Sequence, residues 1–225
     1  MSMLQSFRSR WPVLRTLVLG TFVCCALLVV RCLLMHGISR AGICANIFLA
    51  WVPCLLAIPL DFLLARRPVR NVGVLLLGVL WLLFLPNAAY IVTDLVHWTK
   101  DKQLPRWFDW IFVTSCAWVG LFLGYESIVL LHRRFARTWS EATGWSFVVA
   151  ACILSSAGIY FGRFMRWNSW DVVRKPAVMI GQLVSANFAE VAAFCVAYSV
   201  FTFTGYCMLH GVAAQARRDV SDPSG

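Results

Sequence analysis

One group of polar side chains with the chemistry of a binding or catalytic site lies at the end of a strongly apolar segment. The segment reads FLPNAAYIVTDLVH and contains Asn87, Tyr90, Asp94 and His97. At 3.6 residues per turn these four side chains fall within an arc of about 80° on a helix. The spacing therefore predicts one polar helix face that combines an amide, a phenol, a carboxylate and an imidazole.

A second polar group supplies the positive charge that the first group lacks. It reads YFGRFMRWNSWD and contains Arg163, Arg166 and Asp171, while Glu190 follows in the next apolar segment. Ionisable side chains inside a membrane normally face the interior of the bundle and pair with each other. We therefore expect Asp94 and Glu190 to lie against Arg163 and Arg166.

These residue types allow three kinds of chemistry. Arginines bind phosphate or carboxylate through planar, bidentate hydrogen bonds, so an anionic ligand is the favoured interpretation. Asp94 and His97 are the candidates for a catalytic pair in which the carboxylate orients the imidazole as a general base, although no catalytic residue is assigned. A metal site is disfavoured because the arginines raise the cost of a cation there, and no motif identifies a cofactor. The predicted ligand-binding residues are Asn87, Tyr90, Asp94, His97, Arg163, Arg166, Asp171 and Glu190.

The composition indicates that these groups belong to a membrane protein. The chain has 225 residues, of which 60% are hydrophobic and 13% are charged, whereas soluble domains have about 25% charged residues. The apolar residues gather in blocks of about twenty, the length that spans a bilayer. The net charge of +10 lies mostly in short loops, where it suits lipid headgroups and topology control. Membrane lipid is therefore the expected partner, and nucleic acid is not.

The fold predicted from these blocks is an all-α, polytopic transmembrane helix bundle of about six spans in a single domain, 1–210. Pro86 removes a backbone donor inside the third span and predicts a kink there. Residues 211–225 are small and polar and are predicted to form a mobile C-terminal tail. The predicted spans are about 16–35, 43–65, 71–95, 107–131, 144–164 and 186–209.

Two further carboxylates lie at the other ends of their spans, away from the two polar groups. Asp61 is near the end of the second span and Glu126 near the end of the fourth, and basic residues follow each of them. We expect each to be an acid at the membrane interface, paired with the basic residues that follow it in the sequence.

The distribution of basic residues predicts the orientation of the chain. Arginine doublets gather on the side shared by the two termini and the loops after spans two and four, which the positive-inside rule assigns to the cytoplasm. The polar ends of spans three and five then reach the opposite side, where span six begins. The sequence thus predicts one arginine/carboxylate pocket at the non-cytoplasmic face.

Three stretches resemble a known family. The sequences FLPNAAYIVTDLVH and YFGRFMRWNSWDVV, together with FLAWVP in the second span, are similar to a family of uncharacterised bacterial integral membrane proteins, the domain of unknown function 1361. The resemblance extends from span two to span five. It implies a polytopic helical fold and a location in the bacterial cytoplasmic (inner) membrane, and it implies no activity, substrate or catalytic residue.

Three functions are compatible with these observations. The first is an inner-membrane protein whose pocket binds a lipid headgroup or a partner in envelope assembly. The second is a membrane-embedded enzyme that acts on a lipid-linked substrate through Asp94 and His97. The third is a small-solute transporter, which ranks last because such proteins usually carry internal repeats and the sequence has none.

Overall fold

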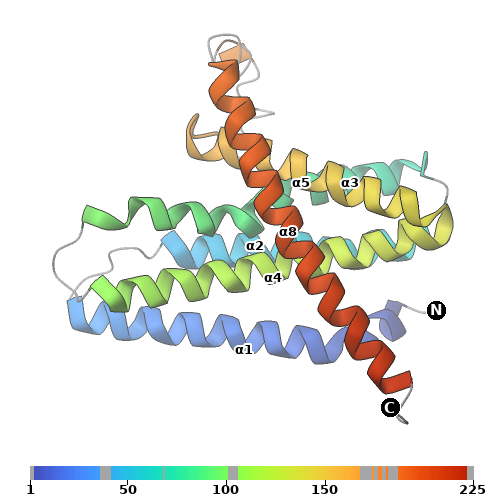
Figure 1. The fold of residues 1–225 in the computed structure, drawn as a ribbon, viewed down its shortest axis with the longest axis horizontal. Coiled ribbons are helices and arrows are strands. Elements are labelled where there is room, and N and C mark those ends of the chain that lie inside the picture. Colours follow the sequence, from blue (N-terminus) through green and yellow to red (C-terminus); the bar gives the residue numbers. More distant parts are fainter. Residues whose placement is uncertain are drawn as a thin grey trace.

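The computed structural model describes residues 3–35, 42–67, 69–100, 106–167, 174, 177–178, 181 and 187–221, and within these only the backbone at 3–9, 35, 44, 96–100, 106 and 217–221. In this described part, six helices are long and apolar enough to cross a membrane, and there is no strand (Figure 1). The protein is therefore an all-α, multi-pass membrane protein, which confirms the predicted fold class.

The helices extend somewhat beyond most of the predicted spans, because polar residues that cap or favour helices flank the apolar blocks. Asn71 caps one helix by accepting a hydrogen bond from the Gly73 amide at 3.1 Å, and Ser140 caps another by accepting from the Thr143 amide at 3.1 Å. The elements are α1 (Met3–Met35), α2 (Gly42–Leu64), α3 (Val72–Tyr90), the 3-10 helix η1 (Ile91–Lys100), α4 (Arg106–Thr138), α5 (Glu141–Arg163) and α8 (Phe188–Ser221).

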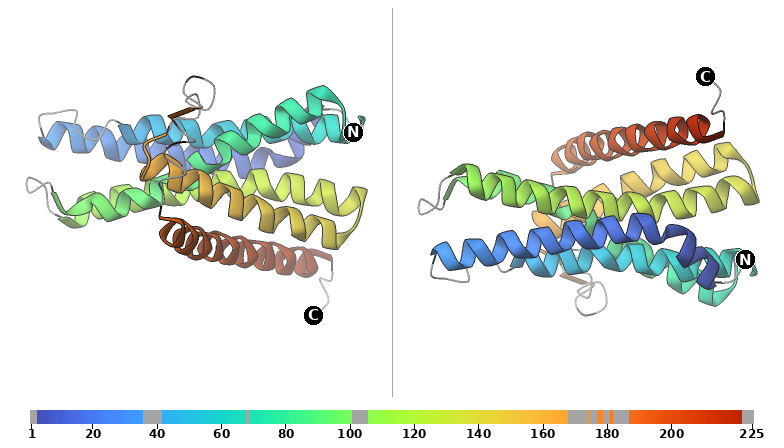
Figure 2. Two further views of the ribbon diagram at one scale, coloured as in Figure 1. Left: turned by 90° about the horizontal axis from the view of Figure 1, so that it is seen from above. Right: turned by 90° about the horizontal axis from the view of Figure 1, so that it is seen from below.

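Helix α4 lies at the centre of the bundle. It packs against α1, α2, α3 and α5, and 61% of its apolar segment is buried. Helix α8 is the peripheral one: only 11% of its apolar segment is buried, and it packs mainly along α5. Figures 1 and 2 show α8 crossing the other helices obliquely on one flank. Most of the surface of α8 is thus available to lipid.

Two glycines allow α3 to approach its neighbours closely. A Cβ atom added at Gly120 of α4 would lie 2.4 Å from the carbonyl oxygen of Ala88, and one added at Gly158 of α5 would lie 2.4 Å from the ring of Pro86. Small residues at such points let membrane helices pack backbone against backbone. Pro86 thus lies inside α3 with its ring against α5, and the kink expected there stays a prediction.

The end of the third span differs from the sequence-based expectation. The α-helix ends at Tyr90, and residues 91–100 form the 3-10 helix η1. Three consecutive β-branched residues, Ile91–Thr93, weaken the preference for α-helix, and the Thr93 hydroxyl donates to the Tyr90 carbonyl at 2.6 Å. The predicted α-helical arc therefore does not extend past Tyr90. In a 3-10 helix, positions three apart align, so positions 94 and 97 still lie on one side.

The last helix extends past the predicted end of the sixth span at about residue 209, and the mobility expected for the tail stays a prediction. Helix α8 continues through residues 211–221 to Ser221. This part of the chain contains Ala213, Ala214 and Gln215, which are strong helix formers. The polar tail expected from composition is therefore helical up to that point.

Ion pairs tie α1 to α4 at both ends of the bundle. The guanidinium Nε of Arg31 lies 2.7 Å from Asp109 Oδ1, and these side chains are 0% and 6% exposed. At the opposite end Arg10 pairs with Glu126. A charge left alone in a low-dielectric interior is costly, so these pairs fix both the register and the direction of α1 against α4.

The two carboxylates expected to pair locally pair across the bundle instead. Asp61 Oδ1 of α2 lies 2.7 Å from Nε of Arg134 on α4, and Glu126 pairs with Arg10. The expectation that both acids are paired is confirmed, but the expected partners were wrong. Helix packing brings a more distant arginine to each acid than the sequence neighbours could suggest.

We predict that Gly120→Ala lowers the stability of the protein by about 1–3 kcal/mol, because the new methyl group meets the Ala88 carbonyl rather than a movable side chain. The measurement is thermal unfolding in mild detergent. Gly78→Ala is the matched control, since a Cβ atom there has nothing within 4 Å and alanine favours a helix by about 1 kcal/mol over glycine. Equal losses of stability in the two variants would contradict the close approach at Gly120.

Candidate functional site

The structure brings together the central pair of the predicted site. Arg163, at the last turn of α5, points a guanidinium Nη1 at Asp94 Oδ1 of η1 at 2.7 Å. The side chains are 13% and 17% exposed, so the ion pair is mostly buried within the protein. The expectation that Asp94 faces an arginine of span five is therefore confirmed.

Other groups hold the two charged side chains in this geometry. Arg163 Nη2 donates to the Thr93 carbonyl at 3.1 Å, and Nη1 lies 3.4 Å from the Tyr90 hydroxyl. The guanidinium also lies 5.4 Å from the centre of the Tyr90 ring, within the range of a cation–π contact. From α2, the Asn46 amide lies 3.4 Å from Asp94 Oδ2. Side chains and backbone from α2, α3, η1 and α5 thus meet around one ion pair.

The remaining predicted residues have different positions. Asn87 is engaged locally, since its amide donates to the Phe84 carbonyl at 3.1 Å. Glu190 is exposed in the first turn of α8. The side chain of His97 and all of Asp171 lie outside the part of the chain that the structure describes, so their predicted roles stay predictions.

Arg166 has an unusual backbone. It is exposed and has a φ angle of 56°, and among the described residues other than glycine it alone has a positive φ. The left-handed region costs a residue with a side chain roughly 1–2 kcal/mol. The turn that contains Arg166 is closed by the Trp167 amide, which donates to the Phe161 carbonyl at 3.1 Å, and the Trp167 and Phe161 rings stack 4.8 Å apart. An arginine thus occupies a position that glycine would fill without strain.

A shallow apolar groove lies beside this polar cluster. Val92 of η1 forms one wall, and Phe194, Ala197, Tyr198 and Phe201 of α8 form the other, around a volume of about 240 Å³. The amino-acid sequence alone did not predict this groove. The spacing of the four α8 residues, at i, i+3, i+4 and i+7, is the signal of a common helix face, but it could not reveal which element that face meets.

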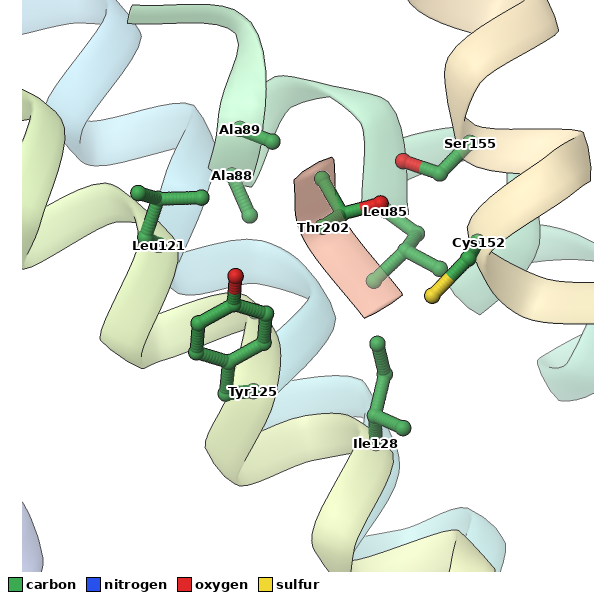
Figure 3. A pocket seen from close by; sticks show the side chains of 10 residues that line it. Leu85, Ala88, Ala89, Leu121, Tyr125, Ile128, Cys152, Ser155 and Thr202 are labelled. Carbon is green, nitrogen blue, oxygen red and sulfur yellow. The ribbon is translucent and has the colours of Figure 1, made fainter. Parts of the chain in front are cut away.

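The interior of the bundle contains a smaller cavity among α3, α4, α5 and α8 (Figure 3). Tyr125, Ser155 and Thr202 contribute hydroxyl groups to its lining, and the volume open to water-sized centres is about 20 Å³. That space suits about one water molecule. The rest of the lining is apolar, and the space is too small for a solute.

A histidine is buried at the opposite end of the bundle, on α4. His132 Nδ1 lies 2.6 Å from the Tyr206 hydroxyl, and the rings of Trp145 and His210 lie 4.9 Å and 5.6 Å away. This cluster joins α4, α5 and α8. Among the described residues, no group of three or more His, Cys, Asp and Glu side chains is placed to hold a metal ion.

We predict that Asp94→Asn and Arg163→Gln each lower the free energy of unfolding by roughly 1–3 kcal/mol, because each leaves a largely buried charge without its counter-charge. The double variant should cost clearly less than the sum, which a detergent-based denaturant titration measures. Arg166→Gln is the control, since that side chain is exposed. Additive losses would show that the pair does not couple η1 to α5.

Comparison with known proteins gives a family without an assigned activity. No curated protein and no solved structure matches the chain. The model of the family described as "Protein of unknown function (DUF1361)" matches residues 45–204, which include most of α2, all of α3, η1, α4 and α5, and the first half of α8. The match includes the Asp94–Arg163 pair and the groove, and it confirms the resemblance seen in the sequence. This multi-pass membrane protein therefore belongs to the DUF1361 family.

Proposed function

We propose that this protein binds the phosphate group of a membrane lipid at the end of the bundle where α5 ends and α8 begins, with Arg166 as the residue that contacts the anion. The observation that carries the proposal is the combination at Arg166 of an exposed cationic side chain and a left-handed backbone. Strained backbone persists where the surroundings enforce it, and it gathers at functional sites.

The proposal assigns different roles to the two arginines. Arg163 already has its charge balanced by Asp94 and donates to the Thr93 carbonyl, so it positions the end of α5 against η1. Arg166 lies three residues further on, where the helix has ended. A guanidinium at the level of the lipid headgroups is well suited to phosphate, because it forms planar, bidentate hydrogen bonds.

The contacts of Asp94 favour binding over catalysis. In the catalytic alternative Asp94 orients the His97 imidazole as the general base. Both carboxylate oxygens of Asp94 already have other partners, since Oδ1 lies 2.7 Å from the Arg163 guanidinium and Oδ2 lies 3.4 Å from the Asn46 amide. We therefore rank lipid binding ahead of an enzymatic function and ahead of solute transport.

The orientation of the site is part of the proposal. We propose that the termini lie in the cytoplasm of a bacterium and the bundle in its inner membrane, which the positive-inside rule and the family resemblance support. The proposed binding site then lies at the non-cytoplasmic face, and the His132 cluster lies at the cytoplasmic face.

We predict that Arg166→Gln weakens the retention of phospholipid about tenfold or more, since a charge-assisted hydrogen bond contributes roughly 1.5–3 kcal/mol. Native mass spectrometry of protein purified in mild detergent and titrated with phospholipid measures this. Arg137→Gln, which removes an exposed arginine at the other end of the bundle, should leave retention unchanged.

Arg166→Gly separates binding from folding. This variant should be at least as stable as the wild type, because glycine adopts a positive φ without strain, and yet it should lose lipid as Arg166→Gln does. Arg166→Lys should recover part of the binding. Unchanged lipid retention in both the glutamine and glycine variants would refute the proposed function.

A further inference from the structure

The apolar groove beside the proposed phosphate site could hold the acyl chain of a lipid. Its α8 wall runs from Phe194 to Phe201, a rise of about 10 Å along the helix. The one hydroxyl among the lining side chains, that of Tyr198, donates to the Ala89 carbonyl at 2.7 Å and is thereby satisfied within the protein. The groove thus presents an apolar wall to the membrane.

One end of the groove meets the end of α5. The Phe194 ring lies 5.3 Å from Phe164 and 5.5 Å from Tyr160, which form an aromatic cluster with it. Arg166 follows Phe164 by two residues, so the backbone of this exposed arginine lies near the same end. An apolar groove that ends beside an exposed cation matches the layout of a phospholipid, in which acyl chains adjoin a phosphate.

A negative charge lies at the same end of the groove. Glu190 is one helical turn before Phe194 on α8 and is exposed. Positions four apart on a helix share a face, so Glu190 lies on the groove face of α8. A cation and an anion, both exposed, therefore flank the place where a headgroup would lie.

We infer that the ligand is a zwitterionic phospholipid with a phosphoethanolamine headgroup, an inference that rests on the proposed function. Arg166 binds the phosphate, Glu190 accepts hydrogen bonds from the primary ammonium, and one acyl chain lies along Val92, Phe194, Ala197 and Phe201. A carboxylate at this place discriminates against a purely anionic headgroup by repulsion. It also discriminates against a quaternary ammonium, which has no N–H to donate.

The experiment is lipid capture from vesicles that contain equal amounts of phosphatidylethanolamine, phosphatidylglycerol and phosphatidylcholine with identical acyl chains. The vesicles are dissolved in mild detergent and equilibrated with the purified protein. The protein is then repurified, and its bound lipids are quantified by mass spectrometry. The wild type should enrich phosphatidylethanolamine about tenfold over each of the other two lipids. Glu190→Gln should keep the phospholipid but bring the ratio of phosphatidylethanolamine to phosphatidylglycerol close to that of the vesicles.

Two alanine substitutions on α8 test the groove. Ala197→Trp fills it and should lower the amount of every bound phospholipid, whereas Ala193→Trp is the matched control, exposed on the same helix and outside the groove lining. If Ala197→Trp does not fold, the lipid ratio in Glu190→Gln still tests the assignment of the headgroup. That variant should fold, since the Glu190 side chain is exposed.

The outcomes separate the two levels of the proposal. Equal capture of the three lipids by the wild type, or an unchanged ratio in Glu190→Gln, overturns the assignment of a phosphoethanolamine headgroup while phosphate binding through Arg166 stands. If Arg166→Gln changes the captured amount of none of the three lipids, the proposed function itself is overturned. Equal effects of Ala197→Trp and Ala193→Trp overturn the role of the groove.

Discussion

The need to pair every charge that enters the membrane governs how this bundle is assembled. Among the described side chains, four ion pairs join different helices, and α4 takes part in three of them, with Arg10, Arg31 and Asp61 as its partners. An unpaired charge is costly in hydrocarbon, whereas a paired one is tolerated. Both helix packing and these ion pairs therefore hold α4 at the centre of the bundle.

The fourth pair differs from the others because it joins two segments at which an α-helix ends. Asp94 belongs to the 3-10 helix that follows α3, and Arg163 to the last turn of α5. Three residues after Arg163 the chain turns at Arg166, whose φ angle is 56°, and the Trp167 amide closes this turn by donating to the Phe161 carbonyl. The proposed function assigns positioning to the paired Arg163 and binding to the exposed Arg166.

Helix α8 is attached by a different kind of interaction. Within the described residues its contacts to the bundle are aromatic stacking, hydroxyl hydrogen bonds and the buried His132–Tyr206 pair, and no ion pair of α8 appears among them. Such contacts leave most of its surface to lipid. These contacts also leave a groove between α8 and η1. The proposed lipid site therefore lies there and not between the tightly packed helices.

The sequence by itself determined the class of the fold and the pairing of Asp94 with an arginine of span five, because apolar length and the cost of buried charge are properties of the residues and apply in any arrangement. Only the tertiary structure decided the partners of Asp61 and Glu126, the change to a 3-10 helix at Ile91, and the groove beside Val92. The polar stretches also singled out Arg166, but they could not reveal its left-handed backbone. The physical reason is that these features depend on which helix faces meet, and packing between elements far apart in the chain sets that choice.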